Sequence, residues 1–123
     1  MNETSLSQKV QTHFKKQYKF CGFILKTSNR FITGIPDLIG HINGRFFAIE
    51  LKRNALEKPK PLQIWFLTQI LKTGAAADVC YSLEQCQEFF LKLYSYNWNK
   101  KDSEIILDKL SKYHKIELTK ARY

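Results

Sequence analysis

The dipeptide Asn43-Gly44 most constrains the fold, because Asn-Gly between apolar segments is the strongest local signal for a two-residue β-hairpin turn. If these residues form the turn, paired positions in the two strands add up to 87, which puts Asp37 opposite Glu50. Directly paired side chains share one face of a sheet, with Cβ atoms about 5 Å apart. Lys52 follows Glu50 by two residues and joins that face. The sequence therefore predicts two adjacent carboxylates with one lysine beside them.

Two adjacent carboxylates require a counter-charge. Like charges directly opposite on a sheet are destabilising, and a buried pair holds a proton or a cation. A divalent cation such as Mg²⁺, which binds carboxylate oxygens and substrate phosphates, would satisfy the pair. The alternative is a solvated strand end at which Lys52 forms a surface ion pair with one carboxylate. The pattern alone leaves both interpretations open.

Composition limits the classes of protein to consider. The chain has 123 residues, enough for one domain with a single core, and is 44% hydrophobic and 14% aromatic, as expected of a globular protein. Apolar runs stay below the roughly 18 residues of a membrane span, and the polar N-terminus lacks the apolar core of a signal peptide. Three cysteines without metal-ligand spacing fit a reducing compartment and argue against a zinc site. We therefore expect a cytoplasmic protein with no membrane partner.

The formal net charge of +9 is distributed unevenly. Residues 1–62 hold eleven Lys and Arg against four Asp and Glu, whereas residues 63–123 hold nine against seven. The basic excess therefore surrounds the acidic pair. A basic surface favours a polyanionic partner, nucleic acid first, with a charge that serves only solubility as the alternative.

Apolar periodicity and turn residues predict the secondary structure. The expected elements are helix 5–17, strand 20–25, hairpin strands 36–42 and 45–52, a helix from Pro61 to Gly74, strand 76–81, helix 82–97 and helix 102–118. Both faces of the hairpin strands are largely apolar, so we expect them to lie centrally between covering layers, with strand 76–81 parallel to a neighbour. The helix that contains Trp65 and Phe66 is apolar almost all round, which predicts that it is packed inside the fold. This order is typical of an α/β domain with a mixed sheet.

The spacing of three short motifs resembles the PD-(D/E)xK nuclease superfamily: Gly34-x-Pro36-Asp37, then Glu50-x-Lys52, then Pro61-x-Gln63 on a following helix. The stretches Gly-Ile-Pro-Asp-Leu-Ile-Gly and Gly-Arg-Phe-Phe-Ala-Ile-Glu-Leu-Lys are similar to its virus-type replication-repair nuclease (VRR-NUC) branch, over roughly residues 3–95. The resemblance implies a restriction-endonuclease-like mixed β-sheet core in the order α-β-β-β-α-β, flanked by helices. Residues 1–97 would form this nuclease core, and 98–123 a C-terminal helical extension of the same domain.

The resemblance also implies a role for each motif residue. Asp37 and Glu50 would ligate Mg²⁺ or Mn²⁺, together with the backbone carbonyl of Leu51. Lys52 would position or polarise the attacking water and stabilise charge that develops on the phosphate. Gln63 would orient a water molecule or ligand.

Further candidates surround these residues. The family often has another acidic residue on the first helix, where Glu3 is the candidate here, so the number of metal ions stays open. Basic residues that would contact nucleic acid around the acidic pair are Lys26, Arg30, Arg53, Lys58 and Lys60.

These observations predict a Mg²⁺- or Mn²⁺-dependent DNA endonuclease that hydrolyses phosphodiesters. The chain carries no recognisable sequence-reading module, which favours structure-directed cutting. Stand-alone members of the resembled branch act as homodimers on four-way junctions, which implies a Holliday-junction resolvase with helix 102–118 as a candidate dimer interface. Flap or single-strand cleavage, RNA as substrate, and a non-catalytic nucleic-acid-binding protein stay open as alternatives. The small basic chain also fits a phage- or plasmid-encoded protein.

Overall fold

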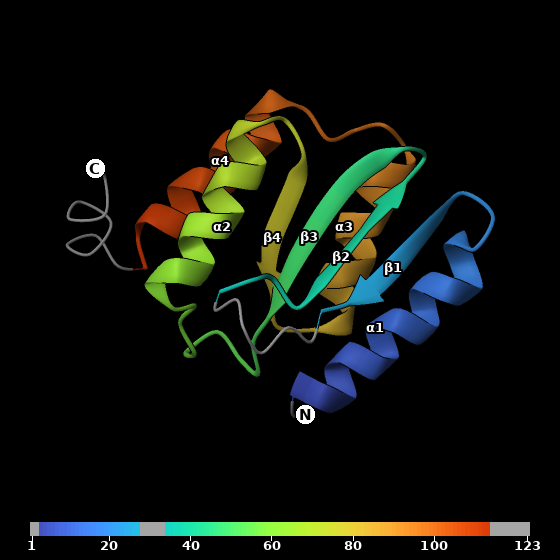
Figure 1. Cartoon of the computed structure of the whole chain (residues 1–123), viewed down its shortest axis with the longest axis horizontal. Coiled ribbons are helices and arrows are strands. Elements are labelled where there is room, and N and C mark those ends of the chain that lie inside the picture. The colour runs from blue at the N-terminus through green and yellow to red at the C-terminus, as the bar shows by residue number, and fades with distance from the viewer. Residues whose placement is uncertain (1–2, 28–33, 114–123) are drawn as a thin grey trace.

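The computed structural model of the chain describes residues 3–27 and 34–113, which form one mixed sheet with helices packed around it (Figure 1). The elements in chain order are α1 (Glu3–Tyr18), β1 (Gly22–Lys26), β2 (Leu38–Ile42), β3 (Arg45–Leu51), α2 (Pro61–Lys72), β4 (Ala76–Cys80), α3 (Leu83–Tyr94) and α4 (Lys100–Ser111). The strand order is β1-β2-β3-β4. The first two pairings are antiparallel and β3 pairs with β4 in parallel, which confirms the α/β prediction and the parallel fourth strand.

The hairpin has the register that its turn residues predict. Asn43 and Gly44 both have positive φ, 52° and 80°, as a type I′ turn requires. Leu38 pairs with Ile49, so paired positions add up to 87 as expected. The strand β2 begins at Leu38 rather than at residue 36, because Pro36 has no backbone N–H to donate and the N–H of Asp37 donates to the Glu50 side chain instead of the ladder.

One face of the sheet is closed by α1 and α3. Phe47 of β3 is fully buried on this closed face. Its ring lies 5.7 Å from that of Phe14 in α1 and 6.0 Å from that of Phe89 in α3, measured between centroids. The aromatic rings thus join both helices to the sheet, and Figure 1 shows α3 behind the strands.

The opposite face is only partly covered, which corrects the expectation of a sheet with covering layers on both faces. The helix α2 packs on β3 and β4, whereas Phe23 and Leu25 of β1 are 55% and 54% exposed. A helix is about 10 Å across and strands lie about 4.8 Å apart, so one helix covers about two strands. Trp65 of α2 is 44% exposed and Phe66 is half-buried, so the prediction of an entirely internal helix was wrong.

The helix α4 packs against α2 and β4. It begins at Lys100 rather than at residue 102, because the Asn99 side chain caps it by accepting hydrogen bonds from the backbone N–H groups of Lys101 and Asp102. It ends at Ser111, and the rest of the predicted helix 102–118 lies partly beyond the described residues. Within the described part of the chain, no helix combines the length and apolarity that crossing a membrane requires.

Candidate active site

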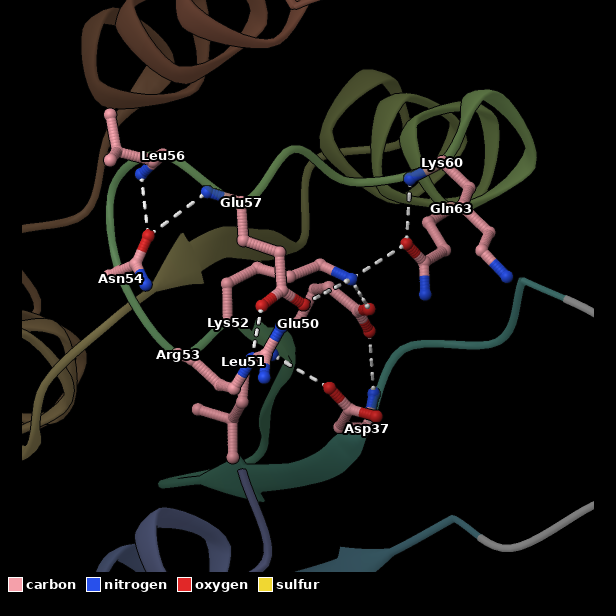
Figure 2. A network of polar contacts seen from close by, with 10 residues as sticks. All are labelled: Asp37, Glu50, Leu51, Lys52, Arg53, Asn54, Leu56, Glu57, Lys60 and Gln63. Atoms are coloured by element: carbon pink, nitrogen blue, oxygen red, sulfur yellow. Dashed lines mark hydrogen bonds and ion pairs between the residues drawn. The ribbon is translucent and has the colours of Figure 1, made fainter. Parts of the chain in front are cut away.

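Asp37 and Glu50 lie together at the end of the sheet opposite the hairpin turn. The backbone N–H of Asp37 donates to Oε1 of Glu50 at 3.2 Å. The backbone N–H of Leu51 in turn donates to Oδ2 of Asp37 at 2.8 Å. Figure 2 shows these reciprocal contacts, in which each carboxylate is held by the neighbouring strand's backbone. The two acids therefore lie on one face, as the turn register predicts.

The segment before β2 is fixed by β1. The Thr27 backbone N–H donates to the carbonyl of Asp37 at 2.9 Å, and the Thr27 hydroxyl donates to the carbonyl of Pro36 at 2.6 Å. These two bonds hold Asp37 next to the ladder although it precedes the strand. Sequence reasoning did not single out Thr27, because no local pattern specifies these two bonds.

Glu50 is a buried acid with a raised proton affinity. Its side chain is 1% exposed. Burial, with a further contribution from the negative charge of Asp37, raises the pKa of Glu50 to about 8, and the neighbouring Lys52 ammonium opposes this rise only in part. A buried carboxyl in this position takes up a proton or a cation at neutral pH.

Lys52 joins this acidic pair from the end of β3. Its ammonium group lies 3.3 Å from Oε2 of Glu50 and donates to Oε1 of Gln63 at 3.1 Å. The side chain is 8% exposed, so these contacts take the place of water around the charge. The ammonium is therefore held in one place, with its charge directed at the acidic end of the sheet.

Glu57 completes the surroundings of Lys52, and sequence reasoning did not single it out. Its Oε1 lies 3.9 Å from the Lys52 ammonium, while its Oε2 accepts from Nε of Arg53 at 2.8 Å. The side chain of Asn54 holds this loop in a turn by accepting from the backbone N–H groups of Leu56 and Glu57. In the sequence, Glu57 stands out only as the single acidic residue of the basic loop 53–60.

Gln63 links the site to the start of α2. Its side-chain oxygen accepts from the Lys60 backbone N–H at 2.8 Å and from the Lys52 ammonium at 3.1 Å. The first of these bonds satisfies a free N–H at the helix start, and Pro61 opens the helix at the next position. The third residue of α2 is thereby joined to the lysine that follows β3 (Figure 2).

The remaining candidates divide into two groups. Lys26, Lys58 and Lys60 are exposed, and Arg53 is exposed while paired with Glu57. Arg30 and the side chain of Glu3 lie outside the described residues. Apart from backbone contacts, the described part of the site thus consists of an acidic pair, a buried lysine, Gln63 and Glu57.

The acidic pair fits a hard divalent cation. Two carboxylates meet with only one lysine to balance them, and Glu50 holds a proton more tightly than usual because it is buried beside Asp37. A divalent cation that displaces this proton would remove the repulsion, and carboxylate oxygens are the ligands that Mg²⁺ and Mn²⁺ prefer. Among the described residues, no group of three or more His, Cys, Asp or Glu side chains forms a metal site. Backbone carbonyl, water or substrate oxygens would complete the coordination.

Comparison with known proteins places this geometry in a class. No family model and no curated protein matches the sequence. A solved structure of a VRR_NUC domain is similar, with 27% sequence identity and a TM-score of 0.57, over 71% of this chain and 96% of that chain. The fold and this likeness define a nuclease of the PD-(D/E)xK type, a class of hydrolases that typically uses divalent metal ions. Within this class, the likeness supports membership of the VRR-NUC family.

Proposed function

We propose that this protein is a Mg²⁺- or Mn²⁺-dependent DNA endonuclease whose active site consists of Asp37, Glu50, Lys52 and Gln63. The observation that carries the proposal is the meeting of two carboxylates with a buried lysine at one end of the sheet. The basic loop after β3 lies directly beside them. This arrangement supports hydrolysis of a phosphodiester better than a purely structural ion pair, because an ion pair between Glu50 and Lys52 does not require a second acid beside it.

Each residue has a distinct task in this proposal. Asp37 and Glu50, with the backbone carbonyl of Leu51, hold the metal ion. A bound Mg²⁺ or Mn²⁺ supplies Lewis acidity to the phosphate and lowers the pKa of a water molecule. The Lys52 ammonium stabilises negative charge on the phosphate oxygens and orients the attacking water. Gln63 is a positioning residue, because it acts by holding the Lys52 ammonium.

The proposed substrate is branched DNA, with a four-way junction first. A junction is symmetric and needs two cuts, which a C2 homodimer with two active sites delivers. We propose that the protein acts in this form as a Holliday-junction resolvase inside the cell, and that it is phage- or plasmid-encoded. Cleavage of flaps or single strands is the second candidate, because the exposed lysines near the site would bind the backbone phosphates of any DNA strand.

The test is a cleavage assay on labelled junction, flap, linear duplex and single-stranded DNA, with a parallel RNA substrate, in Mg²⁺, Mn²⁺ or EDTA. Removing the Lys52 ammonium with Lys52→Ala is expected to reduce the cleavage rate by about 10²- to 10³-fold, the usual effect of losing one transition-state donor. Lys101→Ala, at an exposed position in the first turn of α4, is the matched control and should cut at close to the wild-type rate.

Each result of this assay decides between functions. Metal-independent binding without any cut product would favour a non-catalytic nucleic-acid-binding protein. Full cutting by the Lys52→Ala variant would show that the reaction takes place at another centre. Flap cleavage without junction cleavage would select the second candidate.

A further inference from the structure

The carboxylate of Glu57 contacts two cations of the candidate active site (Figure 2). Its Oε2 accepts from Nε of Arg53 at 2.8 Å, and its Oε1 lies 3.9 Å from the Lys52 ammonium. The same ammonium lies 3.3 Å from Oε2 of Glu50, an acid of the proposed metal site. The Glu57 carboxylate is therefore separated from that site by a single ammonium group.

A carboxylate in this place is similar to a bound phosphate in its charge and its contacts. Both groups are anions with several acceptor oxygens, and the guanidinium fork of arginine binds either of them. Within the loop 53–60, Glu57 is the single acidic residue, beside Arg53, Lys58 and Lys60. The nucleic acid that such a basic loop favours carries its negative charge on phosphates. An incoming strand would therefore compete with Glu57 for the same cations.

The contacts of Glu57 with these two cations are easy to exchange. The side chains of Arg53 and Glu57 are 64% and 26% exposed, so water screens their ion pair, and pairs of this kind add little to stability. The 3.9 Å contact with the Lys52 ammonium is longer than an N–H···O hydrogen bond. A phosphate can thus reach Arg53 from solvent and replace the carboxylate at small cost.

The loop backbone does not have to move for this exchange. The side-chain oxygen of Asn54 accepts from the backbone N–H groups of Leu56 and Glu57 at 2.9 Å and 3.2 Å, and the Asn54 carbonyl also accepts from the N–H of Glu57 at 3.2 Å. These bonds hold the backbone of Glu57 in a turn. Rotation of the Glu57 side chain alone would move its carboxylate away from Arg53 and Lys52.

We propose that Glu57 is a displaceable counter-ion that holds, in the DNA-free protein, the place of a backbone phosphate of the bound strand between Arg53 and Lys52. Before DNA binds, the carboxylate helps to balance an ammonium that is 8% exposed and would be costly to leave without an anion. When DNA binds, a phosphate contacts both cations and the Glu57 side chain turns to solvent. The inference rests on the proposed function and adds to it a phosphate subsite beside the metal site.

Removal of the charge at position 57 tests the proposal. Glu57→Gln keeps an oxygen that can accept from Arg53 but loses the negative charge. Binding of a labelled four-way junction is measured by fluorescence anisotropy in EDTA at several salt concentrations. The variant is expected to bind about threefold to fivefold more tightly, because an exposed ion pair no longer has to be broken. The slope of log K against log salt concentration should become steeper by up to about one unit, because no released carboxylate takes up a cation.

Asp108→Asn is the matched control. Asp108 and Lys112 form an ion pair with the same spacing of four residues, with 2.9 Å between Oδ2 and Nζ. The replacement removes the same charge from α4, a helix that supplies no residue to the proposed active site. Its affinity and slope should stay close to the wild-type values. An equal gain in both variants would show that net charge alone raises the affinity, which overturns the proposal.

Arg53→Ala provides a second measurement. In this background Glu57→Gln should raise the affinity by a clearly smaller factor, because the ion pair that DNA must break is already absent. A gain that stays as large without Arg53 would overturn the proposal. A folded Glu57→Gln variant that binds DNA no more tightly than wild type would overturn it as well, and Glu57→Ala replaces this variant if circular dichroism shows that it does not fold.

The failure of the counter-ion and the failure of the function are distinguishable, because binding in EDTA does not involve cutting. Unchanged affinity of Glu57→Gln, together with Mg²⁺-dependent cutting by wild type, would overturn the counter-ion and leave the nuclease. Tighter binding with a steeper salt slope, together with no cut product in any metal ion, would support the phosphate subsite and overturn the nuclease.

Discussion

The carboxyl group of Glu50 links the stability of the metal-free protein to pH. Its pKa is raised from an ordinary 4.5 to about 8 by burial beside Asp37. Between these two values the folded protein keeps a proton that the unfolded chain has lost, so the folded state binds more protons and the free energy of unfolding falls as pH rises. The contribution is complete below pH 4.5 and is lost by about pH 8. At about 1.4 kcal/mol per pKa unit, the loss amounts to a few kcal/mol.

Urea unfolding in EDTA between pH 5 and pH 8 measures this effect. Wild type is expected to lose more stability over this range than Glu50→Gln, which cannot ionise and still offers an oxygen to the backbone N–H of Asp37. Titrating groups that do not contact Glu50 are common to both proteins, so the difference between the two curves reports Glu50 together with its coupling to Asp37 and Lys52. Parallel curves would show that Glu50 has an ordinary pKa.

At the scale of elements, Gly34 connects α2 to the acidic pair. Its φ is +91°, and a Cβ there would meet Cγ of Leu62 at 2.7 Å and the Leu62 backbone carbonyl carbon at 3.0 Å. Gly34→Ala is therefore expected to destabilise the protein by about 1–3 kcal/mol, since it combines a left-handed conformation with a contact to backbone. Gly34→Ala should also slow DNA cleavage, because relief of the contact with Leu62 would move the segment that leads into Asp37.

Gly44→Ala is the matched control for this prediction. Gly44 also has a positive φ, +80°, but a Cβ there has no heavy atom within 4 Å. Gly44→Ala should lower the free energy of unfolding only by the cost of the left-handed backbone conformation, about 1 kcal/mol. It should leave the cleavage rate per folded molecule unchanged. Thermal unfolding together with single-turnover cleavage separates the two effects. Equal losses for both variants would contradict a role of close packing at Gly34.

Local signals predicted the elements and the pairing of the acids, but not the layers around the sheet. The turn type of Asn43-Gly44 fixes the register, and the register predicts that Asp37 lies beside Glu50, where the Thr27 hydrogen bonds help to hold it. The contact of Glu57 with Lys52 depends on the path of a loop, which no periodic pattern specifies. The exposure of Phe23 and Leu25 escaped prediction because an apolar strand residue has the same sequence signature whether or not a helix covers it.

At the scale of the whole molecule, part of the basic excess lies at the acidic end of the sheet, where a polyanion would approach the two carboxylates. Lys58 and Lys60 are exposed in the loop between β3 and α2, directly after the lysine that contacts Glu50. Lys101 is also exposed but lies near the hairpin-turn end, because Arg45 donates to the Trp98 carbonyl shortly before α4. The net charge of +9 therefore includes lysines at both ends of the sheet, and only those near the acids are expected to contact the cleaved strand.

The salt dependence of DNA binding tests this distribution. Each phosphate contact contributes about one unit to the slope of log K against log salt concentration. Replacing Lys58 and Lys60 together with alanine should lower this slope by about two units and weaken binding to all DNA sequences alike. The slope for Lys101→Ala should stay at the wild-type value. Fluorescence anisotropy in Ca²⁺, with the Lys52→Ala background to prevent cutting, gives these slopes. If Lys101→Ala lowers the slope by about one unit, as one lost phosphate contact would, DNA contacts both ends of the sheet and the directed approach to the acidic end is excluded.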